Sequence, residues 1–342
     1  MPARCTSIGF YTPRDNWPSL NAGCGPVLRR WLSAWLILLA PSALSDNFWP
    51  PENYLGVVDL SSRHLAVDGN YGNVHHIGFD ARYVVSGESG DIGTLLFQPF
   101  VQIADGAGNA RDDFQWRMTN FNFTGLGHGR FNVRLGHFEL PFGLEQVLDT
   151  NGTLEQVQNG VALGLKTDWG ASLNGVLPKF EYEFAFMGGG GNALGSPANG
   201  LFVGRVGTSS DRRLWLGLSA LDGEIEAPSG VQSRRRGGID VGWRLPRGFS
   251  LLAEYAGGED AGDDANFALG QLEWMNLREQ LRLYLQFRFE EQAQFRRRNL
   301  TMGMKYEPNL NLILSAQLGV DISRSQGLGN REVFTTQFRY RF

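Results

Sequence analysis

Cysteine is nearly absent from this chain, and long apolar runs are missing altogether. The two cysteines, Cys5 and Cys24, both lie in the first 45 of the 342 residues. If that stretch is removed, the remaining protein has no cysteine and takes no stability from disulfide bonds. No segment approaches the ~18 to 20 consecutive apolar residues that a membrane-spanning helix needs. The sequence therefore excludes a membrane protein built from spanning helices.

Lysine and histidine are also scarce, and the common enzyme motifs do not occur. The chain contains three lysines and five histidines. Neither G-x-S-x-G nor H-E-x-x-H is present, and Asp149–Thr153 has the composition of a turn rather than of a metal-binding loop. Acid–base or nucleophilic catalysis needs clustered His, Asp or Ser side chains. The sequence therefore predicts neither an enzyme nor a metal or cofactor site.

The N-terminal residues have the pattern of a leader. An arginine pair at residues 29–30 precedes the apolar stretch Trp31–Ala40, and a small-x-small site ends at Ser45. A basic start, an apolar core and a small-residue site predict a secretory signal peptide, here with its core at residues 29–45. A buried helix is the alternative interpretation of the apolar stretch. We expect export of the protein and removal of the leader.

Cleavage before Asp46 would leave residues 46–342 as a single domain. Residues 1–28 are polar and irregular for a signal peptide, so we expect translation to start near Val27. Loss of residues 1–45 removes four arginines and one aspartate from 31 basic and 35 acidic residues, which leaves a net charge of −7. Domains that bind nucleic acids are typically basic. The charge therefore argues against a nucleic-acid partner.

Alternation of apolar and polar residues is what the chain has in abundance. In Arg331–Phe342 it places one set of residues on a single face: Phe334, Thr336, Phe338, Tyr340 and Phe342. A side-chain period of two indicates a β-strand. The same alternation recurs in about 16 segments, each near the ~9 to 11 residues that a tilted membrane strand needs.

The connections between these segments alternate in length. Those after even-numbered segments are short, those after odd-numbered segments are mostly longer, and the longest, Glu139–Gly160, follows the fifth. Short turns at one end and long loops at the other are typical of a transmembrane barrel. The sequence therefore predicts an all-β fold, a transmembrane antiparallel β-barrel of about 16 strands.

The sequence also predicts local features of this barrel. Pro99 in the third strand lacks an N–H for the ladder, so we expect a bulge or a local distortion there. A strand is expected at Val161–Ser172, and loops at Asp222–Ser233 and Gly257–Asp264. Arginine tracts at residues 234–236 and 296–298 would lie beside external loops, either as a solvated rim or as a site for anions or lipopolysaccharide phosphates.

Two stretches carry a resemblance to a known family. Gly136–Gly143, with the sequence GHFELPFG, and the preceding Asp113–Arg117, with the sequence DFQWR, resemble the Gram-negative outer-membrane porin superfamily, most closely its phosphate-selective and related members. The substrate-binding lysine ladder of that group is not visible, because Lys166, Lys179 and Lys305 are the only lysines. The last strand also resembles the signal by which outer-membrane barrels are recognised for assembly. The aromatic residues of this signal would be Phe338, Tyr340 and Phe342.

The resemblance implies a water-filled channel for passive diffusion of small hydrophilic solutes or ions. The loop after the fifth strand would fold inward and constrict the pore with four acids: Glu139, Glu145, Asp149 and Glu155. Six arginines would face the lumen opposite them: Arg82, Arg117, Arg134, Arg282, Arg288 and Arg339. Opposed acids and bases would place a transverse field across the opening. For each arginine, the alternative is a wall residue that pairs with a neighbour such as Asp80 or Glu290.

The resemblance also implies partners and a location. Outer-membrane lipid and lipopolysaccharide, the barrel assembly machinery and small hydrophilic solutes are the expected partners, and porins of this size commonly form homotrimers. The expected location is the bacterial outer membrane. A structural barrel with a plugged lumen and an outer-membrane barrel enzyme are the alternative functions.

Overall fold

The structure of the chain is a computed structural model. It describes residues 54–88, 90–105, 111–127, 129–157, 162–227, 229–293, 295–325 and 331–342. The predicted leader at residues 1–45, its cleavage site and the expected start near Val27 lie outside these residues, as do both cysteines.

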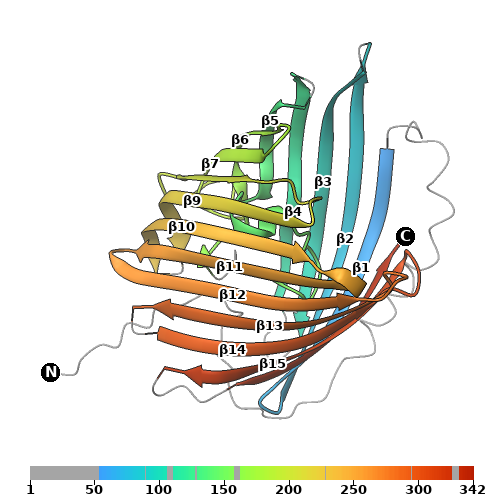
Figure 1. Cartoon of the computed structure of the whole chain (residues 1–342), viewed down its shortest axis with the longest axis vertical. Coiled ribbons are helices and arrows are strands. Elements are labelled where there is room, and N and C mark those ends of the chain that lie inside the picture. Colours follow the sequence, from blue (N-terminus) through green and yellow to red (C-terminus); the bar gives the residue numbers. More distant parts are fainter. Residues whose placement is uncertain are drawn as a thin grey trace.

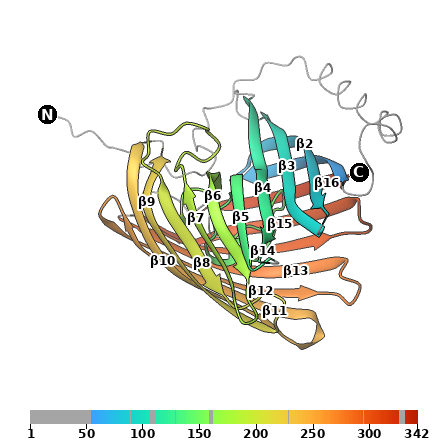
Figure 2. The same cartoon turned by 90° about the horizontal axis from the view of Figure 1, so that it is seen from above.

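The described residues form sixteen strands, which close into one antiparallel β-barrel (Figure 1; Figure 2). Each strand pairs with its neighbours in sequence, and β1 pairs with β16 to complete the ring. The strands are β1 (Tyr54–Val67), β2 (Asn70–Gly87), β3 (Gly90–Asp105), β4 (Arg111–Leu126), β5 (Phe131–Glu139), β6 (Thr167–Val176), β7 (Glu181–Met187), β8 (Leu201–Gly207), β9 (Leu214–Ala227), β10 (Gly230–Arg244), β11 (Phe249–Asp260), β12 (Asp263–Met275), β13 (Leu281–Gln292), β14 (Phe295–Tyr306), β15 (Leu312–Arg324) and β16 (Glu332–Arg341). The predicted fold class and strand number are confirmed.

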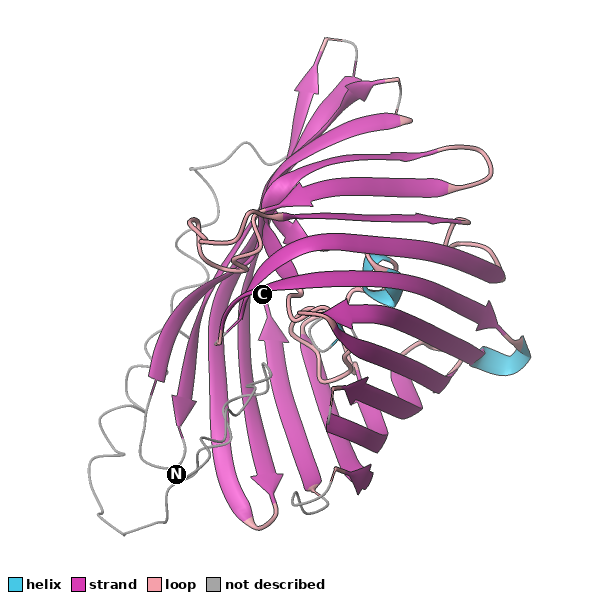
Figure 3. Cartoon of the chain, turned by 90° about the vertical axis from the view of Figure 1, so that its left-hand side faces the viewer, coloured by secondary structure: helices cyan, strands magenta, loops and turns pink. Residues whose placement is uncertain are grey.

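Strands make up most of the described chain, as Figure 3 shows. Two short 3₁₀ turns are η1 (Gly143–Gln146), which follows β5, and η2 (Pro246–Gly248), which joins β10 to β11. Among the residues that the structure describes, no helix has both the length and the apolar character needed to cross a membrane.

Side chains alternate between the two faces of the wall. In β7, Glu183, Ala185 and Met187 are buried, whereas Phe184 and Phe186 are 51% and 47% exposed. The same alternation runs through β8 and β9. Because successive side chains of a strand point to opposite faces, the exposed apolar residues cover the outside of the barrel and the buried ones line its inside.

The two ends of the barrel differ. β1 begins and β16 ends at the same end of the barrel, because the two strands are antiparallel partners. We call this the terminal end. The β5–β6 segment, residues 140–166, leaves the wall from the opposite end and is the longest connection between strands whose bounds the structure gives. Residues 158–161 of this segment are not among those described.

Two predicted loops are wrong. The stretch expected as a loop at Asp222–Ser233 forms the ends of β9 and β10, and the stretch at Gly257–Asp264 belongs mostly to β11 and β12. The physical reason is that a hairpin can extend beyond the band of apolar side chains on the outside of the barrel. There the outward side chains are polar, as in a loop, but the backbone hydrogen bonds between the strands continue. The arginine tracts at residues 234–236 and 296–298 accordingly lie in β10 and β14.

The strand predicted at Val161–Ser172 is wrong in its first half. β6 begins only at Thr167, and the residues from Ala162 to Lys166 belong to the β5–β6 segment. Leu163 is fully buried in an apolar cluster. Apolar residues in this stretch pack against an inner apolar surface rather than facing lipid, and a sequence pattern cannot distinguish these two surroundings.

The bulge predicted at Pro99 is confirmed, and it positions a candidate site residue. In the β3–β4 ladder, Gln98 pairs with Met118 while Pro99 pairs with Trp116. Arg117 is therefore the extra residue of β4, as in a β-bulge. The bulge lies where Pro99 has no N–H to donate, and it places the Arg117 guanidinium beside Asp59.

Candidate functional site

The interior of the barrel is occupied by the β5–β6 segment, which begins with a tight turn at Gly143. The φ angle of Gly143 is +59°, and a Cβ here would come within 2.5 Å of the Glu254 carboxylate. Its N–H donates to Ser219 Oγ on β9 at 2.9 Å, and the N–H of Leu144 donates to Glu254 Oε2 on β11 at 2.8 Å. Only glycine combines this backbone conformation with so close an approach.

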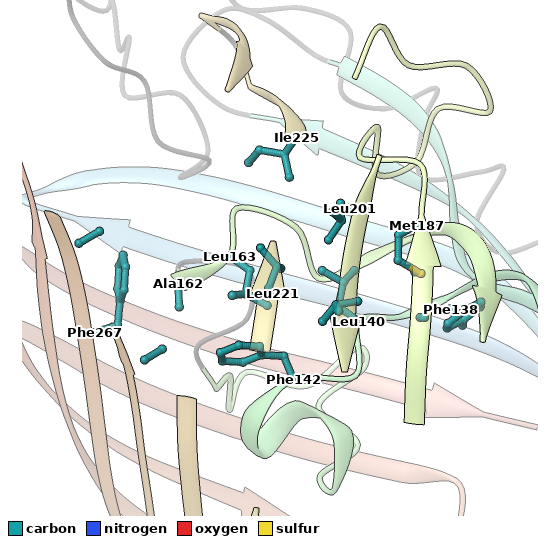
Figure 4. Packing of buried hydrophobic residues seen from close by; sticks show 14 residues of the cluster. Phe138, Leu140, Phe142, Ala162, Leu163, Met187, Leu201, Leu221, Ile225 and Phe267 are labelled. Atoms are coloured by element: carbon teal, nitrogen blue, oxygen red, sulfur yellow. The ribbon is translucent and has the colours of Figure 1, made fainter. Parts of the chain in front are cut away.

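An apolar cluster holds the same part of the segment against the wall (Figure 4). Leu140, Phe142 and Leu163 of the segment are fully buried. Their neighbours in the cluster come from inner positions of β5, β7, β8, β9, β11 and β12: Phe138, Ala185, Met187, Leu201, Val203, Leu221, Ile225, Ala256, Ala265 and Phe267. Burial of this surface from water favours a docked segment.

The tip of the segment is held by polar side chains from other strands. The carbonyl oxygens of Asn151, Gly152 and Thr153 accept hydrogen bonds from a row of side chains on β16 and β1: Arg339 (3.0 Å), Gln337 (2.8 Å) and Arg63 (3.3 Å). The Gln156 carbonyl accepts hydrogen bonds from Gln286 and Arg288 on β13. The segment therefore contacts strands on well-separated parts of the ring.

The four predicted constriction acids have different surroundings. Glu145 pairs with Lys166 at 2.8 Å and accepts a hydrogen bond from Thr150, so this acid is neutralised within the segment itself. Glu139 lies 3.9 Å from the same lysine and accepts a hydrogen bond from the Asn151 side chain at 2.8 Å.

The other two acids lie nearer the tip. Glu155 pairs with Arg282 of β13 at 3.4 Å and accepts a hydrogen bond from Gln271, so here the structure brings together a predicted acid and a predicted arginine. Asp149 is exposed, and its carboxylate accepts a hydrogen bond from the Asn151 N–H at 2.9 Å. Of the four acids, Asp149 is the one most open to solvent.

Five of the six predicted arginines make contacts in the interior. Arg117 and Arg339 share the carboxylate of Asp59, Arg134 pairs with Glu183 at 3.1 Å, and Arg282 and Arg288 contact the segment as described above. Arg82 is exposed near the terminal end of β2. Most of these arginines therefore have acidic neighbours in the wall, while three of them also reach the segment.

Sequence reasoning missed several charged residues of the interior. Asp59 is 2% exposed between Arg117 and Arg339, and Asp80 pairs with Arg341 at 2.6 Å. With Arg63, these residues form a group of four arginines and two aspartates on β16, β1, β2 and β4. The polar residues Asp59, Ser61 and Arg63 alternate with other residues, and this pattern could have placed them on the inner face. It was missed because the alternation is weak over the first strand as a whole.

Three further ion pairs, which centre on two acids, lie inside the opposite arc. Arg205 forms a two-point contact with Asp240, through Nε at 3.0 Å and Nη2 at 2.7 Å. Arg234 and Arg236 both lie 2.6 Å from Asp260. Within the described ranges, no group of three or more His, Cys, Asp or Glu side chains is arranged to hold a metal ion.

The residues of the proposed assembly signal lie on β16 and, for Phe342, directly after it. Phe338 is exposed on the outer face, and the rings of Tyr340 and Phe342 lie 5.5 Å apart. The backbone of Phe342 exchanges two hydrogen bonds with Val58 of β1, at 2.7 and 3.1 Å. The end of β16 therefore helps to close the ring.

Comparison with known proteins supports the fold. No family model and no curated relative matches the sequence. The anion-selective porin of Comamonas acidovorans matches the structure with a TM-score of 0.62 and 12% identity, over 84% of this chain and 99% of that one. OprB of Pseudomonas putida gives 0.66 and 10%, over 85% and 94%.

The chain has the fold of outer-membrane porins. A trimer form of OmpT, an outer-membrane protein of Vibrio cholerae, also matches, with a TM-score of 0.58 and 11% identity over 84% of this chain and 99% of that one. These identities are too low to carry a substrate or an assembly state from any relative to this porin-like barrel.

Proposed function

We propose that the protein is an outer-membrane porin, a water-filled channel for passive diffusion of small hydrophilic solutes or ions. The observation that carries the proposal is the arrangement of the wall: a closed ring with exposed apolar side chains outside and charged side chains inside. Closure satisfies the backbone hydrogen bonds within lipid. An interior rich in ion pairs favours hydration over a dry core.

The proposed selectivity depends on the charges that lie beside the tip of the β5–β6 segment. The arc of β16, β1, β2 and β4 carries Arg63, Arg117, Arg339 and Arg341 against two acids, whereas Asp149 on the segment is exposed. Such an arrangement would orient a permeating solute in a transverse field. The constriction role of Glu139, Glu145, Asp149 and Glu155 is part of this proposal.

Single-channel conductance of refolded residues 46–342 in a planar bilayer tests the proposal. We expect stable conductance steps, and under a salt gradient the sign of the reversal potential reports whether the basic arc or the segment acids dominate. Correctly folded protein without conductance would contradict the porin proposal.

A plugged barrel is the second candidate function. It is favoured by the apolar cluster beneath the β5–β6 segment and by the five side chains that hold its tip. A variant that lacks residues 147–157 separates the two candidates. A plugged barrel would conduct only after this deletion, whereas a porin would conduct before it and give larger steps after it.

One described contact bears on the enzyme alternative. Ser61 Oγ lies 3.2 Å from His76 Nδ1, and His76 Nε2 lies 3.1 Å from Gln102 Oε1. A hydroxyl beside an imidazole is the geometry of an activated nucleophile, but the third group is a neutral amide, which cannot stabilise an imidazolium as a carboxylate does. We infer that these residues connect β1, β2 and β3. Labelling by a fluorophosphonate probe that Ser61→Ala abolishes would instead favour a hydrolase.

We also propose export through a cleaved leader to the outer membrane, where lipid, lipopolysaccharide and the assembly machinery are the partners. A trimer is the assembly state proposed. Mass spectrometry of the mature N-terminus tests cleavage before Asp46, and cross-linking in isolated outer membranes tests the trimer. Intact protein that retains residues 1–26 would contradict the expected start near Val27.

A further inference from the structure

A groove lies at the terminal end of the barrel, between the turn that joins β8 to β9 and the turn that joins β10 to β11. It has a volume of about 440 Å³, and its lining consists of Asp211, Arg213, Arg244, Leu245 and Pro246. Two bases and one acid give this lining a net positive charge. The groove is therefore suited to a ligand that carries negative charge.

The Arg244 side chain bridges the two turns without meeting an acidic side chain. Its Nη1 donates to the carbonyl oxygens of Asp211 at 2.8 Å and Arg212 at 3.2 Å, and its guanidinium carbon lies 5.2 Å from the ring centre of Trp215. The Nε of Arg213 donates in turn to Arg244 O at 3.1 Å. These neutral partners orient the two guanidinium groups but do not neutralise them.

Two further arginines add positive charge at the edges of the groove. Arg212 directly precedes Arg213, and Arg247 is the middle residue of η2; both are exposed. Among the residues that the structure describes, none of the four arginines forms an ion pair. The groove and its edges therefore carry four bases and one acid, Asp211.

The groove begins where the apolar band on the outside of the barrel ends. Leu214 and Trp243 are partners in the β9–β10 ladder and are 51% and 44% exposed. The next pair toward the terminal end is Arg213 with Arg244, whose N–H donates to Arg213 O at 2.7 Å. A lipid whose acyl chain lies against Leu214 and Trp243 therefore places its headgroup at the level of the two arginines, and tryptophan is enriched at this level of membrane proteins.

We propose that this groove binds the headgroup of an anionic glycerophospholipid. Arg213 and Arg244 contact the phosphate, because the planar guanidinium fork matches phosphate geometry. Arg212 and Arg247 attract the same headgroup from the edges, as clustered basic residues beside a membrane attract anionic lipids. The inference rests on the proposed location in the outer membrane, and it adds a lipid contact that channel function does not require.

Native mass spectrometry of the folded barrel, residues 46–342, in detergent micelles tests the site with phosphatidylglycerol as the probe. Phosphatidylcholine, which has the same phosphate but no net charge, and inorganic phosphate are the comparison probes. We expect a lower Kd for phosphatidylglycerol than for phosphatidylcholine, and a Kd for phosphatidylglycerol that rises about fivefold in Arg213→Gln, as for loss of one basic residue beside an anionic lipid.

Two more variants complete the test. Arg247→Gln removes an exposed charge from the tip of a turn, so it keeps the site testable if Arg213→Gln fails to fold, and it should also raise the Kd. Arg235→Gln is the matched control, because Arg235 is an exposed arginine of β10 near the opposite end of the barrel. We expect this control to leave the Kd unchanged.

The outcomes separate the lipid site from the channel. Equal binding of phosphatidylcholine, an unchanged Kd in both groove variants, or equal weakening in Arg235→Gln overturns the site. Displacement of phosphatidylglycerol by inorganic phosphate at equal concentration means a site for free anions and also overturns the lipid site. Conductance without selective lipid binding leaves the porin proposal intact, whereas selective binding by a barrel that does not conduct supports the site and overturns the porin proposal.

Discussion

At the residue scale, the most consequential side chain is a small carboxylate that sequence reasoning passed over. Asp59 is the shared partner of Arg117 and Arg339, and it is almost fully buried. Removal of one partner from a buried ion pair leaves uncompensated charge away from water. The two arginines that the sequence did identify therefore depend on an acid that it did not.

We expect Asp59→Asn to lower the free energy of unfolding by about 3 to 5 kcal/mol. Urea unfolding in micelles, followed by tryptophan fluorescence, measures the change. Asp222→Asn is the matched control, because its ion pair with Arg235 is about 70% exposed on both sides and exposed pairs contribute little. Equal effects of the two substitutions would contradict a special role for Asp59.

Asp149 is the residue at which selectivity can be tested most directly. At a distance of about 10 Å in water, one unit charge changes the energy of a permeating ion by ~0.4 kcal/mol. Because the charge acts with opposite sign on anions and cations, we expect Asp149→Asn to raise the anion-to-cation permeability ratio roughly fourfold, as measured by the reversal potential under a salt gradient. Glu259→Gln changes an exposed acid on the outer face of β11 and should have no effect. An unchanged ratio in Asp149→Asn would remove this residue from the constriction.

At the element scale, the β5–β6 segment was predicted in position but not in its manner of attachment. Its place after the fifth strand follows from the length of the irregular stretch. The apolar contact of Leu163 with the inner wall could not be predicted, since an apolar residue has the same pattern whether it faces lipid or a covered inner surface. For the same reason the stretch before Thr167 resembled a strand.

Gly143 is the position at which attachment of the segment is most sensitive. In Gly143→Ala, a Cβ would sit at positive φ, which costs roughly 1 to 2 kcal/mol, and would collide with the Glu254 carboxylate. We expect a loosened segment, seen as noisier and larger single-channel currents. Gly195→Ala is the control, because a Cβ there meets no atom within 4 Å. Quiet currents of unchanged size in Gly143→Ala would show that the segment tolerates the side chain.

At the scale of the whole molecule, the sequence predicted a barrel but did not predict how far its strands extend beyond the apolar band. The alternation of apolar and polar residues predicted about 16 strands, because the strands expose apolar residues on one face. The strand ends at Ala227 and Gly230 were missed because polar residues there continue the ladder beyond the apolar band. Charge partners such as Arg205 and Asp240, which lie on different strands, follow from the register of pairing, and a single sequence does not specify that register.

The closing strand offers a test in cells. We expect Phe342→Ala to reduce the amount of folded protein in the outer membrane severalfold, because the proposed assembly signal loses its final aromatic residue and Tyr340 loses its ring contact. Heat-modifiable mobility of outer-membrane fractions measures the folded amount. Phe334→Ala removes an exposed aromatic residue from the same strand and should have a much smaller effect. Equal losses would indicate a general requirement for aromatic residues on β16.

The attachments of the β5–β6 segment also determine the order of events during folding. The carbonyl groups of residues 151 and 152 are held by Arg339 and Gln337, which are separated from them by more than half of the chain. Contacts between residues so distant in sequence form late and slow the folding of a chain. The segment can therefore complete its final contacts only once β16, the last strand in the sequence, is in place.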